Sequence, residues 1–308
     1  MALAVVLGPV DQTLDALSKA SLEPILLAFA CLPLVQFLRA WRFQCMLFPG
    51  LRPPNFVMMR IAVLVVFFNG ILPFRIGELS FPLLAKREFG LDIGHSLGLL
   101  VAVRAYDLVA LLSLGCLCIV VLDQPGYLVG AAISLGLCLL GLIVLARFIV
   151  PRIGERADRV LSLRWVGSAL AAFLRGFAEI SGNGRYLAFV GLTFAIWILQ
   201  FVVCYLVLIS IAGNIGYWGF WQGSLAGAGA YLSFVLPVNG LAGLGPMQAG
   251  WVLVLGQFGY AMSASIGSGL LLNGIYVLGA AGLAGIVTML GFLGWSSPSK
   301  SNVSPGKR

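Results

Sequence analysis

Four ionisable residues of the sequence fall where burial in a membrane is expected. They are Arg75, Glu78, Arg104 and Asp107. Each pair is spaced i, i+3, so in a helix its two members lie on one face. An unpaired charge at the centre of a bilayer costs about 2.5–3.5 kcal/mol or more, and these four charges sum to zero. The pattern therefore predicts pairing between the two sets, Arg75 with Asp107 and Glu78 with Arg104, or the converse.

Ionisable residues inside a membrane usually face a bundle interior or a water-filled cavity, and they are candidates for function. We therefore interpret these four residues as a site for a lipid headgroup. The alternative is a buried ion-pair latch between residues 61–78 and a neighbouring helix. A latch would need only one pair, so the presence of two favours binding.

The elements that position these residues must be membrane helices. Of the 308 residues, 60% are hydrophobic and 10% are charged, and no Asp, Glu, Lys or Arg occurs from Tyr186 to Ser299. A soluble domain carries about 25% charged residues, so this composition excludes a soluble enzyme, a disordered chain and a nucleic-acid binder. We predict an all-α fold, a polytopic transmembrane helical bundle.

Metal and cofactor chemistry finds little support in the sequence. His95 is the single histidine, and no G-x-x-x-x-G-K-[ST] loop occurs. The six cysteines lie in or beside apolar runs and are expected to be small buried hydrophobes. We predict no cofactor, no metal and no catalytic residue. The net charge of +8 indicates contact with anionic lipid headgroups, since the basic residues flank hydrophobic runs.

Hydrophobic runs divide the chain into three parts. Residues 1–21 form an N-terminal segment, 22–295 a single transmembrane domain and 296–308 a polar tail. Within the domain, halves of about 22–150 and 186–295 are joined by residues 151–185, which we predict to be amphipathic and cytoplasmic. A spanning helix needs about 20 apolar residues. The runs long enough to cross are Leu22–Leu38, Ser96–Leu122, Tyr127–Val150, Tyr186–Ala212, Tyr217–Leu236 and Ile266–Trp295.

The run Ile61–Phe74 is short for a crossing, and the charge distribution indicates that it does not cross. The arginine-rich segments 39–60 and 147–185 should both lie inside. Three apolar runs separate them, which would put them on opposite sides if all three crossed. Asn69, Gly70 and Pro73 stand where a helix would break, so we predict that 61–74 is a re-entrant hairpin.

The second half of the chain repeats features of the first. From Phe89/Phe258 through Arg104/Asn273 the matches keep an offset of 169 residues. Duplicated halves with interrupted hydrophobic segments are typical of transporters with a central substrate site. We expect the breaks to line that site, together with neutral groups of both halves. The breaks are Pro73, Gly77, Pro237, Gly243 and Gly245, and the neutral groups are Asn69, Gln248, Asn273 and Tyr276.

Three motifs resemble one known family. Residues 69–79 read N-G-I-L-P-F-R-I-G-E-L, residues 104–108 read R-A-Y-D-L, and Pro237 precedes glycines from Gly240 to Gly245. Together these are similar to the membrane domain of lysylphosphatidylglycerol synthetases and their stand-alone relatives. The resemblance implies translocation of a lipid without the soluble domain that makes it. Gln248 departs from the family pattern, in which Glu is common at this position.

The sequence thus predicts a multi-pass protein of the inner membrane that acts as a lipid flippase or scramblase. Its ligands would be phospholipids or lipid-linked headgroups. One alternative is a non-transporting accessory that presents a lipid to a glycosyl- or aminoacyltransferase. Another is an intramembrane enzyme using Glu78 or Asp107 as acid–base. A lipid-modifying enzyme and further copies of the chain are compatible partners.

Overall fold

The structure is a computed structural model that describes residues 10–47, 55–122, 185–213, 216–235 and 245–292. The elements formed by these residues are all helical, which confirms the predicted all-α bundle. The long helices are α3 (Leu22–Leu47), α6 (Ile93–Val121), α10 (Arg185–Ala212) and α13 (Met262–Phe292). The shorter ones are α2 (Val10–Ser18), α4 (Phe56–Ile71), α5 (Ser80–Phe89), α11 (Gly216–Val235), α12 (Pro246–Gln257) and the 3₁₀ helix η1 (Pro73–Leu79).

Four helices of the described residues are long and apolar enough to cross a membrane, namely α3, α6, α10 and α13. Helix α3 differs from the prediction, because it continues for nine residues beyond Leu38 and ends at Leu47. Arg39 and Arg42 therefore belong to a membrane helix and not to a loop. The predicted crossing at 127–150, the segment 151–185 and the tail 296–308 lie outside the described residues.

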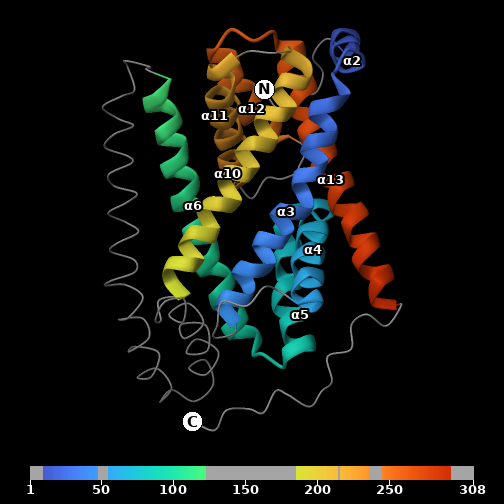
Figure 1. Cartoon of the computed structure of the whole chain (residues 1–308), viewed down its shortest axis with the longest axis vertical. Helices are drawn as coiled ribbons and strands as arrows, with labels where there is room; N and C mark the ends of the chain where they lie inside the picture. Colours follow the sequence, from blue (N-terminus) through green and yellow to red (C-terminus); the bar gives the residue numbers. More distant parts are fainter. Residues whose placement is uncertain (1–9, 48–54, 123–184, 214–215, 236–244, 293–308) are drawn as a thin grey trace.

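Helices α3 and α10 pack antiparallel and form the centre of the bundle (Figure 1). At one end the Ser21 N–H donates to the Ser210 carbonyl at 2.7 Å. Nearer the other end Arg42 donates to Thr193 at 3.3 Å. The end of α3 and the start of α10 thus share one end of the bundle.

The polypeptide breaks after α4 and folds back. Leu72 is extended (φ −79°, ψ 135°), as expected for the residue before a proline, and η1 then packs on the end of α4. Gly77 is required there, since a Cβ would overlap the backbone of Phe68 and Asn69. Residues 61–74 are therefore not one straight helix, and α4 and α5 lie at the same end of the bundle (Figure 1). Their re-entrance into a bilayer stays a prediction.

A second pair of short helices, α11 and α12, lies at the opposite end (Figure 1). They approach closely where a Cβ on Gly250 would overlap the Gly229 carbonyl oxygen. Gly245, with φ of 113°, begins α12 in a conformation that favours glycine. Helix α11 has 20 residues and is not among the four candidate spans, and the full crossing that the sequence predicts for residues 217–236 stays a prediction.

The two halves share one order of elements, a long helix, a short pair and a second long helix. Gly90 and Gly259, 169 residues apart, both follow a short helix with positive φ (70° and 79°). Ser96 Oγ donates to the Asp92 carbonyl at 3.0 Å, and Ser265 Oγ to the Ala261 carbonyl at 3.1 Å. These matches support the predicted internal repeat, whose origin by duplication stays a prediction.

Candidate lipid-headgroup site

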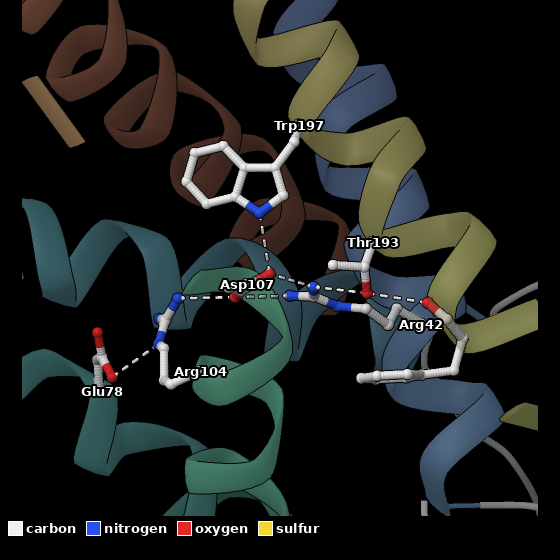
Figure 2. A network of polar contacts seen from close by, with 7 residues as sticks. Arg42, Glu78, Arg104, Asp107, Thr193 and Trp197 are labelled. Atoms are coloured by element: carbon white, nitrogen blue, oxygen red, sulfur yellow. Dashed lines mark hydrogen bonds and ion pairs between the residues drawn. The ribbon is translucent and has the colours of Figure 1, made fainter. Parts of the chain in front are cut away.

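An alternating chain of charges joins η1, α6 and α3 (Figure 2). Arg104 Nε donates to Glu78 Oε2 at 3.0 Å, and Arg104 Nη1 to Asp107 Oδ2 at 3.2 Å. Arg42 Nη1 donates to Asp107 Oδ1 at 2.5 Å. The predicted pair of Glu78 and Arg104 is therefore present. The side chain of Arg75 lies outside the part that the structure describes, so its predicted pairing stays a prediction. Arg42 lies beside Asp107.

Helix α10 holds the Arg42–Asp107 pair from the other side (Figure 2). Trp197 Nε1 donates to Asp107 Oδ1 at 3.3 Å. Thr193 Oγ1 accepts from Arg42 and donates to the Phe189 carbonyl at 2.9 Å. The side chains of Arg42 and Asp107 are only 4% and 9% exposed. Such a pair is held by its own attraction together with further hydrogen bonds, and removing one partner would leave a buried charge.

Sequence reasoning missed Arg39, Arg42 and Trp197. The arginines were assigned to a cytoplasmic loop because they resemble the basic flank of a span. A usable signal was present, since Arg39 and Arg42 repeat the i, i+3 spacing and the residues after them, through Leu47, are still mostly apolar. Trp197 had no comparable signal, because an indole in an apolar helix is ordinarily read as core.

The charged chain borders a cavity of about 460 Å³. This volume lies within the range of about 300–1,000 Å³ that is common for ligand sites. The predicted residues that line it are Asn69, Arg104, Asp107, Asn273 and Tyr276. Elements far apart in the sequence therefore meet at one site.

Other predicted residues lie beside the cavity or elsewhere. Glu78 is not among the lining residues, but it accepts from Arg104, which is. Gln248 is not among the lining residues, because its Oε1 accepts from the Gly245 N–H at 2.7 Å and caps α12. Of the predicted breaks, Pro73 begins η1, Gly77 lies within it and Gly245 precedes α12. Pro237 and Gly243 lie outside the described residues.

The part of the wall formed by α11 and α13 is polar without charge. Tyr231 donates its hydroxyl proton to the Tyr276 hydroxyl at 2.6 Å. Asn273 lies one turn before Tyr276 on α13 and is largely buried. Among the described lining residues the charged ones all come from α3 and α6, namely Arg39, Arg42, Arg104 and Asp107.

One wall of the cavity extends to the outer face of the bundle. Val101 and Leu108 of α6 both line the cavity, and they are 46% and 39% exposed. Arg104 lies between them on the same face, with 40% of its side chain exposed. A charged group and an exposed apolar surface are therefore continuous at this point.

Metal ligands do not gather in the described part of the chain, where no three His, Cys, Asp or Glu residues come together. Each carboxylate of the cavity region is instead bound to arginine. The arrangement can bind a polar or anionic group by hydrogen bonds and charge, and we assign it no bond-making step.

The sequence also matches a described protein family. The family model named lysylphosphatidylglycerol synthase TM region covers residues 1–292. Comparisons with curated proteins and with solved structures find no match. The family match covers every element described above, including both walls of the cavity.

Proposed function

The chain belongs to the lysylphosphatidylglycerol synthase TM region family, and on this premise we propose that it moves lipids across the inner membrane. It would act as a flippase or scramblase, and not as an enzyme. The family is membrane-associated and lipid-related, which is compatible with this role. The choice of transport depends on the geometry of the cavity.

The observation that carries the proposal is the continuity between a charged cavity and a lipid-facing wall. A headgroup beside Arg104 would meet Asp107 and Asn273 inside the bundle. Its acyl chains could stay in the bilayer against Val101 and Leu108. Moving a headgroup through bare hydrocarbon would leave its polar groups unsatisfied. A polar path with an apolar opening removes most of that cost.

The position of the short helices supports movement between two leaflets. Asn69 and Gly70, at the end of α4, line the cavity from one end of the bundle. Met247, at the start of α12, lines it from the other. In transporters built from repeats, the substrate site lies near the midplane between the repeats, and one repeat moves against the other around it. A cavity between two pairs of short helices could open alternately to either leaflet.

The test is translocation of labelled phospholipids in proteoliposomes. We expect wild type to move label between leaflets and the Arg104→Gln variant to be slowed at least about tenfold, because a charge-assisted hydrogen bond to the headgroup is lost. Arg87→Gln is the matched control, since Arg87 is 81% exposed and lies outside the cavity. Equal rates for wild type and Arg104→Gln would remove this cavity from the path.

A further inference from the structure

Arg39 differs from the other cations of the cavity. It lies about one turn before Arg42 on α3, is half-buried and lines the cavity. Arg42 and Arg104 are both bound to carboxylates. No described residue forms a hydrogen bond or an ion pair with the Arg39 side chain, although Arg42, Arg104 and Asp107 are close enough to act on its charge. Arg39 therefore presents an unmatched positive charge to the cavity.

The single carboxylate among the described lining residues is already occupied. Asp107 Oδ1 accepts from Arg42 and Trp197, and Oδ2 accepts from Arg104 at 3.2 Å and from Arg42 at 3.4 Å. It has little capacity left for a ligand amine. The described lining residues include three arginines and this one aspartate, so the wall is positive overall. Such a wall attracts anions and repels cations.

Neutral groups of the cavity complete a site for an oxygen-rich ligand. Asn69 Oδ1 is buried and has no hydrogen-bond partner among the described residues, so it can accept from a hydroxyl. The side chains of Gln200, Asn273 and Tyr276 also line the cavity. Amide N–H groups can donate to phosphate oxygens, and Asn69 can accept from a glycerol hydroxyl. No titratable base other than the occupied aspartate stands among these lining groups.

We propose that the cavity selects phosphate-bearing headgroups of net negative charge, and that Arg39 binds the phosphate. The inference rests on the proposed lipid transport and specifies its substrate class. Arginine suits this role because its planar guanidinium can donate two parallel hydrogen bonds to phosphate. The exposed apolar wall at Val101 and Leu108 assigns the phosphate to a lipid and not to a soluble ester.

The first measurement is lipid retention by the purified full chain, read by native mass spectrometry. The lipids are phosphatidylglycerol, phosphatidylethanolamine and the cationic ethylphosphatidylcholine, with identical acyl chains at equal concentration. We expect wild type to retain phosphatidylglycerol most strongly and the cationic lipid least. Arg39→Gln should lower the preference for phosphatidylglycerol about tenfold, and Arg39→Lys should keep part of it. Arg87→Gln should behave as wild type, because its charge is outside the cavity.

Three outcomes would overturn the inference. They are equal retention of the three lipids by wild type, an unchanged preference in a folded Arg39→Gln variant, and release of phosphatidylglycerol by millimolar inorganic phosphate. The last would assign the site to a soluble phosphate. Circular dichroism verifies that both Arg39 variants are folded. If Arg39→Gln unfolds, the preference for phosphatidylglycerol is measured with Arg39→Lys.

A second measurement separates this inference from the proposed function. The same three lipids, labelled on one chain, are followed in proteoliposomes. Selective retention without translocation of any lipid by wild type would refute transport and leave the anionic site standing. Translocation at equal rates for the three lipids, with equal retention, would refute the selectivity and leave transport standing.

Discussion

The two walls of the cavity are built by different physical means. On the α3–α6 side, buried charges hold the elements together, and Asp107 alone accepts from three side chains. On the side formed by α11, α12 and α13, close glycine contacts and hydrogen bonds between neutral groups hold the elements together. Gly229 and Gly250 form such a contact, and Tyr231 and Tyr276 such a hydrogen bond. The comparison shows that one site can combine a charged wall with a closely packed neutral wall.

The largest effect should follow from breaking the charged wall. Asp107→Ala leaves Arg42 buried without a charged partner, which costs about 3–5 kcal/mol. We expect a marked fall in Tm of the purified protein, measured by differential scanning fluorimetry. Asp15→Ala is the control, because Asp15 pairs with Lys19 on the exposed α2 and surface pairs contribute about 0–1 kcal/mol. An equally small effect of both substitutions would contradict the structural role of Asp107.

The packing of the neutral wall can be tested by adding one methyl group. Gly250→Ala places a Cβ against the Gly229 carbonyl and should destabilise by about 1–3 kcal/mol. Gly256→Ala, in the same helix but with open space around it, should stabilise by about 0.5–1 kcal/mol through helix propensity. Thermal unfolding of the two variants should therefore shift in opposite directions. Shifts of the same sign would show that α11 and α12 do not approach as described.

The smallest effect should come from the hydroxyl pair on the neutral wall. Tyr276→Phe removes the acceptor of the Tyr231 hydrogen bond, and its expected cost is about 0.5–1.5 kcal/mol. Lipid translocation should fall less than in Arg104→Gln, because no charge is lost. Tyr260→Phe, which loses a hydrogen bond to Gln222 away from the cavity, is the comparison variant. A larger transport defect in Tyr276→Phe than in Arg104→Gln would show that the neutral wall contributes more to translocation than the charged wall.

Sequence reasoning located most of the fold and part of the site. Apolar run length identified the four long helices, and Pro73 and Gly77 marked the break that the structure shows. It misplaced the end of α3, because an arginine at the end of an apolar run usually marks the membrane boundary. Hydrophobic length alone does not distinguish a crossing from a helix that enters and returns, so the crossing at residues 217–236 stays a prediction.

It was harder to predict which residues of the site pair with each other than to predict which residues belong to it. Neutrality of the four charges indicated pairing, and the Glu78–Arg104 pair follows from it. Asp107 also binds Arg42, which lies 65 residues away in the sequence. Whether these two residues meet depends on how α3, α6 and α10 pack. Gln248 was assigned to the headgroup, yet it caps α12. The capping role depends on the backbone conformation at Gly245, which the sequence pattern alone does not specify.

The sequence by itself determined that this protein is a membrane-embedded helical bundle and where its chain must break. These properties follow from local physics, since the bilayer sets the length of an apolar helix and proline and glycine set the backbone conformations available. Only the tertiary structure decided which charges meet, which wall of the cavity is exposed on the outer face, and that no described residue forms an ion pair with Arg39. Each of these depends on the relative rotation and register of helices distant in sequence, so no single segment encodes it.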